Sequence, residues 1–276
     1  MGKKERLDKL LVDKGLVDSR EKAKRYIMAN LVKVNGITVN KAGTRCEIDS
    51  QLYIKKDASR FVSRGGDKLE KALTEFGIDV NGKTIIDVGA STGGFTDCLL
   101  KYGAKKVYCV DVGYGQLDWA LRKDERVVCI ERTNIRYLDK DRFDFLFDLA
   151  TVDVSFISLE KVFPVLDGLL KDKGEVIALI KPQFEAGKDL VKKGGIVDDP
   201  AVHQEVINNI LKKVRSDFLF LNLTFSPIKN YPGNIEYLVY LIKNKGYNDL
   251  NLTNINLIKK IVNEAHHFFS SKESLS

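Results

Sequence analysis

The chain has 276 residues, of which 44% are hydrophobic and 30% are charged. This length and balance indicate a soluble protein with one sizeable core and room for a smaller second domain. They exclude a membrane-spanning protein, because no apolar run approaches the roughly 18 residues that a span requires. Since Met1–Arg6 leads into no apolar signal core, we expect a cytoplasmic protein.

The excess of positive charge lies in residues 1–60. They hold 15 Lys and Arg against 8 Asp and Glu, whereas the rest of the chain holds 30 of each sign. A localised basic excess favours a polyanionic partner, of which nucleic acid is the commonest. A solvated charged surface gives the same pattern, so the charge alone does not decide between these interpretations.

Cysteine and histidine spacing gives no metal-binding pattern, and we expect no metal. Three of the four cysteines lie in apolar segments, where the simplest interpretation is a buried small hydrophobic side chain. The histidines are interpreted as surface residues. The residues concerned are Cys46, Cys98, Cys109 and Cys129, and His203, His266 and His267.

The first segment begins with two predicted helices. Leucines among residues 7–11 fall at helical spacing, and Gly15 is suited to end the first helix. Ser19 can cap a second helix, which turns Ala23 and Ile27 inward and several basic residues outward. The two helices therefore predict one apolar layer and one basic surface.

A hairpin follows the helices. Val32–Val34 and Ile37–Val39 alternate in polarity, and Asn35-Gly36 between them is a strong turn signal. A further strand is expected at 51–56. This small α+β unit, placed at residues 1–57, resembles the S4-type RNA-binding domain, named for a ribosomal protein. The matching residues are Ser19-Arg20, Ala23, Ile27 and Val32-Lys-Val-Asn-Gly36.

The resemblance implies binding of structured RNA through the basic helix face, by recognition of shape and phosphate. Asn30 stands where this domain usually has glycine, and asparagine also tolerates the left-handed conformation. The residues expected to contact RNA are Arg6, Lys9, Arg20, Lys22, Lys24, Arg25 and Lys33.

Residues 58–66 are expected to link this unit to a larger domain at 67–269, with a disordered tail at 270–276. From Lys83 onward strands alternate with helices, which predicts a doubly wound, mostly parallel α/β sheet. The strands are expected near 84–88, 106–111, 126–131, 145–154, 175–181, 219–226 and 236–243, and the helices near 94–103, 116–123, 158–171 and 201–215. Seven strands, the last two close together, suit the Rossmann-like methyltransferase sheet with an antiparallel strand near one edge.

The segment Asp87–Phe95 follows an apolar strand and opens a helix. Open α/β sheets bind nucleotide-like cofactors at this point, because the backbone can approach a ligand only where side chains are absent. The glycine spacing fits neither a dinucleotide pyrophosphate nor a phosphate loop. It resembles the S-adenosylmethionine loop of class I methyltransferases. The loop residues expected to bind this cofactor are Asp87, Gly89, Ala90, Ser91, Thr92, Gly93, Gly94 and Phe95.

The next two strands add further cofactor candidates. Asp111 lies about 20 positions beyond the glycine turn, where an acid can accept hydrogen bonds from ribose hydroxyls, although strand-end aspartates also cap loops. Gln116 and Leu117, in the segment Gly113–Leu117, are expected to line the part of the site that holds the adenosine. Asn134 follows the third strand and is a candidate for the adenine, with a simple turn role as the alternative.

Four charged residues stand out by context. Lys68 lies at a helix N-terminus, where the helix dipole disfavours a cation. Asp153 and Lys181 end strands, at the edge where this fold places its sites, and Glu236 begins the last strand. Each of them, taken singly, is more simply a solvated charge.

In order and context these four residues resemble the Lys-Asp-Lys-Glu tetrad of FtsJ-type RNA ribose 2′-O-methyltransferases. The chain as a whole resembles the TlyA family of ribosomal RNA 2′-O-methyltransferases, often named hemolysins. The resemblance implies methylation of cytidine riboses in ribosomal RNA. It is carried by Phe61–Leu69, Asp87–Phe95, Asp153–Leu159, Lys181–Glu185 and Gly233–Tyr237.

A ribose hydroxyl is a poor nucleophile while protonated, so the enzyme must orient the oxygen and remove its proton. We expect Lys181 to accept this proton and Asp153 to hold it, while Lys68 and Glu236 position the ribose. The loop Lys188–Gly195 is expected to be a lid, an RNA contact or a plain flexible loop.

Three other functions stay open. The chain could be a non-catalytic RNA-binding assembly factor, although such a protein need not keep both lysines and both acids. A second possibility is a membrane-active hemolysin, but the sequence shows no signal segment. The amphipathic segment Ile255–Phe269 is better explained by packing on the core. A small-molecule or protein methyltransferase would leave the basic first domain unexplained.

Overall fold

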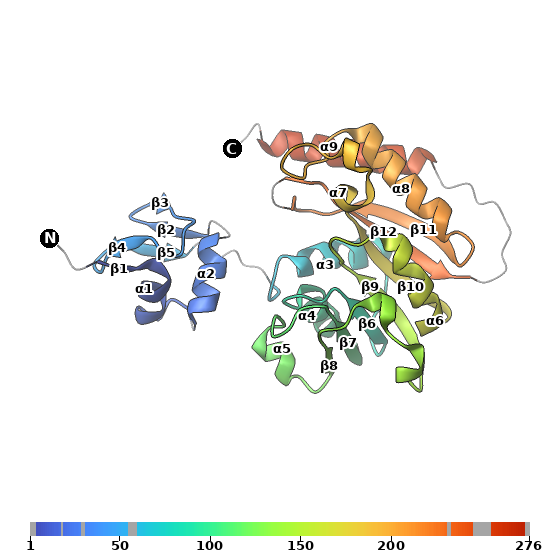
Figure 1. Cartoon of the computed structure of the whole chain (residues 1–276), viewed down its shortest axis with the longest axis horizontal. Coiled ribbons are helices and arrows are strands. Elements are labelled where there is room, and N and C mark those ends of the chain that lie inside the picture. The colour runs from blue at the N-terminus through green and yellow to red at the C-terminus, as the bar shows by residue number, and fades with distance from the viewer. Residues whose placement is uncertain are drawn as a thin grey trace. The chain divides into compact units, whose positions relative to one another are not determined.

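A computed structural model of the chain describes residues 4–17, 19–28, 31–54, 60–230, 233–244 and 255–273. The chain divides into two compact units, residues 1–59 and 60–276, each with its own apolar core (Figure 1). None of the helices in these described ranges is long and apolar enough to cross a bilayer.

The first unit contains the two predicted helices, α1 (Leu7–Asp13) and α2 (Arg20–Met28). Their apolar faces meet in a small core that includes the fully buried Leu7, Leu11 and Ile27. Ser19 Oγ accepts a hydrogen bond from the Lys22 amide at 3.2 Å, so the predicted cap is confirmed.

Two small sheets complete this unit. β2 (Val32–Val34) pairs with β3 (Ile37–Thr38) and β5 (Leu52–Ile54). Asn35 and Gly36 both have positive φ, 50° and 84°, as the predicted two-residue hairpin turn requires. A second pair, β1 (Lys4–Arg6) with β4 (Arg45–Glu47), was not predicted, because three-residue strands with charged ends show no apolar alternation.

The second unit is built on a seven-stranded sheet in the order β11-β12-β10-β9-β6-β7-β8. β12 runs antiparallel to both of its neighbours and the other internal pairings are parallel, which confirms the predicted methyltransferase-like sheet. The strands are β6 (Thr84–Val88), β7 (Lys106–Val110), β8 (Val127–Ile130), β9 (Phe147–Val152), β10 (Leu170–Ile180), β11 (Phe218–Phe225) and β12 (Tyr237–Lys243).

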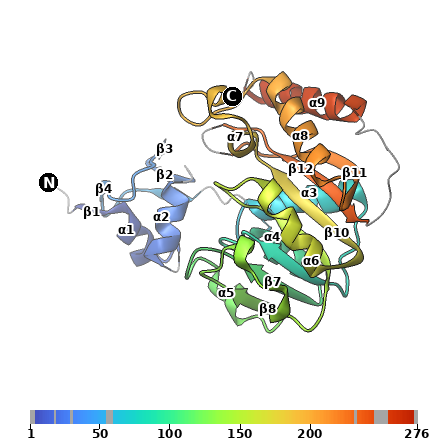
Figure 2. The ribbon, with the colours of Figure 1, turned by 45° about the vertical axis from the view of Figure 1, so that its right-hand side comes forward.

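Helices cover both faces of this sheet (Figure 2). Two apolar clusters fill the space between helices and strands. One includes α3, α4 and α5, and the other includes α6, α8 and α9. The helices are α3 (Gly65–Phe76), α4 (Gly94–Lys101), α5 (Trp119–Lys123), α6 (Phe163–Leu169), α7 (Pro182–Glu185), α8 (Pro200–Val214) and α9 (Ile255–Glu273). The amphipathic face of α9 is therefore used in packing, since Ile258, Val262 and Ala265 are fully buried.

Segment boundaries differ from the expected ones in two places. The units divide at residue 59, inside the expected linker, and Phe61 is 5% exposed in the core of the second unit. A side chain on Gly66 would overlap the Phe61 ring at 2.2 Å, so the glycine permits this packing. The expected helix at 158–171 consists of a 3-10 turn, Leu159–Lys161, followed by α6. It ends at Leu169, because the buried Leu170 already belongs to β10, opposite Phe147 of β9.

The prediction that His203 lies at the surface was wrong. Its ring is fully buried between α8 and β12, bonded to the Tyr237 hydroxyl at 2.8 Å and to the Val197 carbonyl at 2.9 Å. His266 of α9 lies 3.1 Å from it and is partly buried, whereas His267 is exposed. A histidine in a polar-looking helix segment gives no sequence signal for such partners.

The cysteines differ in exposure. Cys129 is exposed although its strand is apolar, whereas Cys46, Cys98 and Cys109 are buried.

We expect His203 to make stability depend on pH. Burial lowers the pKa of His203 from 6.5 to about 4. Between pH 6.5 and about 4, His203 is protonated in the unfolded chain but stays neutral in the folded protein. Protonation therefore favours the unfolded chain, and the stability that the protein has above pH 6.5 decreases as the pH falls towards 4. A His203→Gln variant should be less stable than wild type at pH 7.5, and the difference in Tm should shrink by pH 4.5. Thermal unfolding checks this, with the exposed His267→Gln as control; a constant difference would contradict it.

Candidate active site

The glycine loop lies between β6 and α4, and its Gly89 packs closely against Asp153, the residue that follows β9. Gly89 has φ of +83°, and a Cβ on it would lie 2.4 Å from the Asp153 carbonyl oxygen. Gly93 has φ of +93°, and a Cβ there would overlap Leu117 and Leu121. Both positions need glycine for conformation and for space, which leaves bare backbone at the carboxyl edge of the sheet.

Asp87 holds this loop from beneath. Its carboxylate is fully buried and accepts hydrogen bonds from Thr96 Oγ1 at 2.6 Å and Thr151 Oγ1 at 2.9 Å. Burial raises the pKa of Asp87 to about 6, and the two hydroxyls oppose that shift. The residue joins β6 to α4 and β9, so it shapes the loop rather than lining the cleft.

Asp111 lies at the end of β7 and is tied to two backbone amides. Oδ2 accepts from the Ser91 amide at 2.7 Å, and Oδ1 accepts from the Gly113 amide at 2.7 Å. The carboxylate therefore joins the glycine loop to the segment after β7. It remains partly exposed at the wall of the cleft, as a ribose-binding acid requires.

These elements enclose a cleft of about 480 Å³, which lies in the range of small-molecule sites. A smaller pocket adjoins it behind Asp111. Seven of the predicted cofactor residues line one or both: Gly89, Ala90, Ser91, Asp111, Gln116, Leu117 and Asn134. Five others lie outside the lining: Asp87, Thr92, Gly93, Gly94 and Phe95.

Part of the cleft wall was not predicted from the sequence. Residues 154–158, together with Thr133, Arg136 and Lys161, also line it. Their only signal was position, because loops that follow neighbouring parallel strands meet at one edge. Phe156 is 90% exposed with a positive φ of 63°, and its ring lies 4.8 Å from that of Phe184.

Lys68 and Glu236 form a buried ion pair at the edge of the cleft region. Lys68 Nζ lies 2.6 Å from Glu236 Oε2. Lys68 is 8% exposed and Glu236 is fully buried. Two neutral amides approach the other oxygen, since Asn230 donates to Oε1 at 2.9 Å and Gln183 at 3.4 Å.

Lys181 and Asp153 form the second pair. Lys181 Nζ lies 2.6 Å from Asp153 Oδ1 and donates a hydrogen bond to Ser155 Oγ at 2.9 Å. Lys181 is 6% exposed, so its charge is largely removed from water. The hydrogen bond to Ser155 directs the amine towards the loop that lines the cleft.

Sheet register brings the two pairs to one edge. Ile180 of β10 lies opposite Tyr237 of β12, so the next antiparallel step places Lys181 beside Glu236. Asp153 follows β9, the other neighbour of β10, and its amide donates to the Val88 carbonyl at 2.9 Å. The four residues that sequence position singled out are thus drawn to the edge that holds the glycine loop.

A second open cavity, of about 510 Å³, borders this edge. It is lined by the two neighbouring phenylalanine rings and by residues beside them, in α7 and in the loop after it: Phe156, Ile157, Ser158, Gln183, Phe184, Ala186, Lys188 and Val191. Part of the expected loop Lys188–Gly195 therefore contributes to a cavity beside the paired lysines.

In the first unit, two of the predicted RNA contacts share one buried carboxylate. Asp8 is fully buried and accepts from Arg6 Nε at 3.0 Å and from an Arg20 guanidinium nitrogen at 2.8 Å. These hydrogen bonds hold the pKa of Asp8 well below its usual range. Both arginine side chains stay about half exposed, at 45% and 51%.

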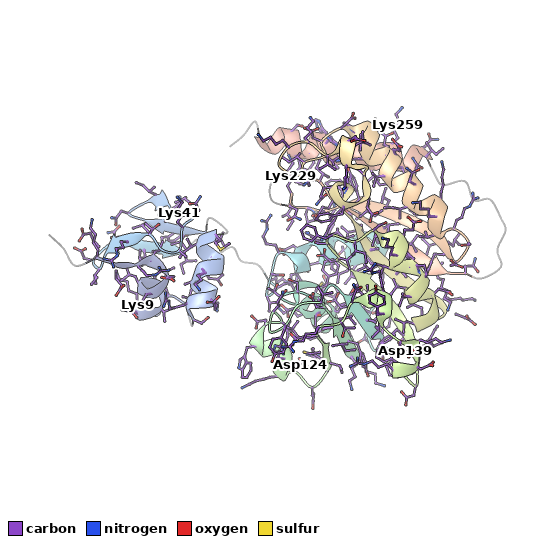
Figure 3. All side chains as sticks on the ribbon, viewed as in Figure 1. Lys9, Lys41, Asp124, Asp139, Lys229 and Lys259 are labelled. Carbon is purple, nitrogen blue, oxygen red and sulfur yellow. The ribbon has the colours of Figure 1, made fainter. Side chains whose placement is uncertain are left out.

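The other predicted RNA contacts lie on the same unit. Lys9 of α1 (Figure 3) is exposed and pairs with Glu5 at 2.6 Å, and Lys33 of β2 is exposed. Lys22 and Lys24 are partly buried on α2, and the side chain of Arg25 lies outside the described residues.

The seven-stranded sheet, the glycine loop and the acid at the end of β7 define a class I S-adenosylmethionine-dependent methyltransferase. S-adenosylmethionine fits the residues present. Gly89 leaves backbone open where any Cβ would cause an overlap, and the cleft is large enough for this cofactor. Among the described residues no group of His, Cys, Asp or Glu is arranged to hold a metal ion.

Comparison with known proteins gives the family. Residues 61–243 match the FtsJ-like methyltransferase family and residues 5–52 match the S4 domain. The chain is 48% identical to "Putative rRNA methyltransferase YqxC" of Bacillus subtilis, over 99% of this chain and 98% of that one. It is 40% identical to the 16S/23S rRNA (cytidine-2′-O)-methyltransferase TlyA of Mycobacterium tuberculosis, over 87% and 91%.

A solved structure from Streptococcus thermophilus, described as a "Putative hemolysin", is 44% identical with a TM-score of 0.77, over 98% of both chains. The chain belongs to the TlyA/hemolysin A family, in which an S4 domain precedes an FtsJ-like methyltransferase domain.

Proposed function

We propose that this protein methylates the 2′-hydroxyl of a ribose, that of a cytidine, in ribosomal RNA. The observation that carries the proposal is the pair of contacts Lys68–Glu236 and Lys181–Asp153 at the edge of the sheet beside the cofactor cleft. The names of the relatives support the substrate, since two describe rRNA methyltransferases and one specifies cytidine 2′-O-methylation.

When bound, S-adenosylmethionine supplies a methyl group already activated by its sulfonium. The remaining task falls to the protein, which must place the ribose oxygen and take its proton. We assign proton acceptance to the amine of Lys181. The ammonium that results would be stabilised by Asp153, 2.6 Å away, and oriented by Ser155. Lys68, fixed by Glu236, would hold the ribose.

Cofactor binding is assigned to the lining of the cleft. Gly89 and Ser91 would bring the backbone of the glycine loop close to the cofactor, and Asp111 would accept hydrogen bonds from its ribose hydroxyls. Gln116, Leu117 and Asn134 would surround the adenosine.

The alternatives account for fewer observations. A non-catalytic assembly factor explains the S4 domain but not two lysine–carboxylate pairs, each with a largely buried lysine, at a methyltransferase cleft. A membrane-active role finds no support in α9, whose apolar face packs on α8 and β11.

The test is transfer of labelled methyl from S-adenosylmethionine to unmodified ribosomal subunits. The RNA product is then hydrolysed with alkali, which cannot cleave next to a 2′-O-methyl ribose. We expect the label in alkali-resistant dinucleotides. Label in alkali-sensitive mononucleotides would place the methyl group on a base and overturn the proposal.

A second expectation concerns RNA binding by the first unit. Asp8→Asn should weaken binding of ribosomal RNA about tenfold, because Arg6 and Arg20 lose the shared carboxylate that holds them. Charge alone predicts the opposite, since the variant is more positive. Filter binding at fixed salt, with the exposed Asp49→Asn as a charge-matched control, separates the two. Tighter binding by Asp8→Asn would contradict the expectation.

A further inference from the structure

The Glu236 carboxylate is held by side chains outside the four paired residues. Oε2 faces Lys68 at 2.6 Å, while Oε1 accepts from Asn230 Nδ2 at 2.9 Å and, more weakly, from Gln183 at 3.4 Å. Glu236 is fully buried, so these contacts replace water. Asn230 thereby sets the rotation of the carboxylate and hence the direction in which Oε2 faces Lys68.

Asn230 is held in place by a second asparagine. Its amide donates to the Asn234 carbonyl at 2.9 Å, in an isolated antiparallel bridge between the two residues. Asn234 is 2% exposed, and both ends of its side-chain amide are used. Nδ2 donates to the Gly195 carbonyl at 2.8 Å, and Oδ1 accepts from the Val197 amide at 2.9 Å. Asn234 therefore connects Asn230 to the loop after α7.

An amide suits this position for a physical reason. A carboxylate only accepts hydrogen bonds, and a buried one with an unsatisfied oxygen is destabilised. A lysine or arginine at position 230 would satisfy Oε1 but would compete with Lys68 for the same negative charge. Asn230 supplies a donor without a charge, so Glu236 stays paired with Lys68.

We propose that Asn230 is a positioning residue for methyl transfer, acting through Glu236 on Lys68, and that Asn234 holds it in place through the hydrogen bond between their backbones. This inference rests on the proposed role of the Lys68–Glu236 pair in 2′-O-methylation. It assigns no contact between Asn230 and substrate or cofactor; its effect is on the geometry of the ribose-holding pair, which governs the rate of the chemical step.

The test uses the full-length protein with Asn230→Ala, Asn230→Asp and a matched control, Asn208→Ala. Asn208 is also a partly buried asparagine, but its amide donates to the Gln204 carbonyl within α8. With saturating S-adenosylmethionine and ribosomal subunits, we expect Asn230→Ala to lower kcat by about ten- to a hundredfold. The Kd for S-adenosylmethionine, measured by calorimetry, should change by less than about twofold, because Asn230 does not line the cleft.

Asn230→Asp keeps the size of the side chain and distinguishes positioning from folding. Two carboxylates at hydrogen-bond distance cannot both ionise readily, so one of them binds a proton more tightly. At lower pH that shared proton restores a hydrogen bond to Glu236. The activity of Asn230→Asp relative to wild type should therefore rise as the pH is lowered from 8.5 to 6.5.

The outcomes separate the inference from the function on which it rests. Asn230 variants with kcat within about twofold of wild type, or with losses that match their folded fraction and a pH profile parallel to wild type, would overturn the positioning role. A wild-type protein that binds S-adenosylmethionine but leaves no alkali-resistant label in either subunit would instead overturn the proposed function.

Discussion

Replacement of Lys181 by alanine is expected to lower kcat for RNA methylation about a thousandfold while the affinity for S-adenosylmethionine stays the same. Lys181 is buried at the edge of β10 and lies beside Asp153 and Ser155, where an amine can receive the ribose proton. Proton transfer by a positioned side chain contributes about a hundred- to ten-thousandfold to a rate. Alanine removes that group without entering the cofactor cleft.

Single-turnover methylation of ribosomal subunits measures the chemical step directly. Lys213→Ala is the control, because Lys213 forms a solvent-exposed ion pair with Glu160 on the surface. Calorimetry with S-adenosylmethionine shows that the cleft is intact. Turnover within about tenfold of wild type, in a variant that binds both substrates, would contradict the assignment of Lys181 as proton acceptor.

Gly89→Ala is expected to abolish cofactor binding, with an increase in Kd of at least about a hundredfold. The new Cβ would lie 2.4 Å from the Asp153 carbonyl oxygen and 2.8 Å from its carbonyl carbon, both of them backbone atoms. Relief of this overlap requires β6 and β9 to separate at their carboxyl ends, and that movement displaces the cleft wall and Asp153 together. The positive φ adds about 1–2 kcal/mol of strain.

A substitution at a second glycine separates the steric overlap from the backbone strain. Gly82 also has positive φ, at +72°, but a Cβ on it would meet no atom within 4 Å. Gly82→Ala should therefore show the conformational loss of stability without the loss of cofactor affinity. Calorimetric titration of both variants checks this, together with their Tm. Equal Kd values for Gly89→Ala and wild type would show that the close approach to Asp153 is not needed for binding.

Much of the second unit could be predicted from sequence because parallel strands place their carboxyl ends at one edge. Asp153 and Lys181 are strand-end charges in the sequence, and the structure brings them within 2.6 Å. Glu236 directly precedes the antiparallel strand β12, so the N-terminal end of that strand reaches the same edge. The order and direction of the strands therefore bring these three residues, which are far apart in the sequence, to the same edge of the sheet.

Other features have no local signal. The sequence predicts that Asp87 binds the cofactor. In the structure its carboxylate is buried beneath the glycine loop and accepts hydrogen bonds from Thr96 and Thr151. His203 reads as a surface residue, because its partners on β12 and before α8 are set by tertiary packing. Asn230 lies in a turn segment where asparagine is common for backbone reasons alone. Only its contact with Glu236 distinguishes it.

The two lysine–carboxylate pairs are proposed to serve methyl transfer to a ribose oxygen of RNA. Mass spectrometry of nucleosides from ribosomal subunits, treated with S-adenosylmethionine and either wild type or Lys181→Ala, tests this role. We expect new 2′-O-methylcytidine with wild type and almost none with the variant. Base-methylated nucleosides with wild type, or equal 2′-O-methylcytidine with both proteins, would contradict it.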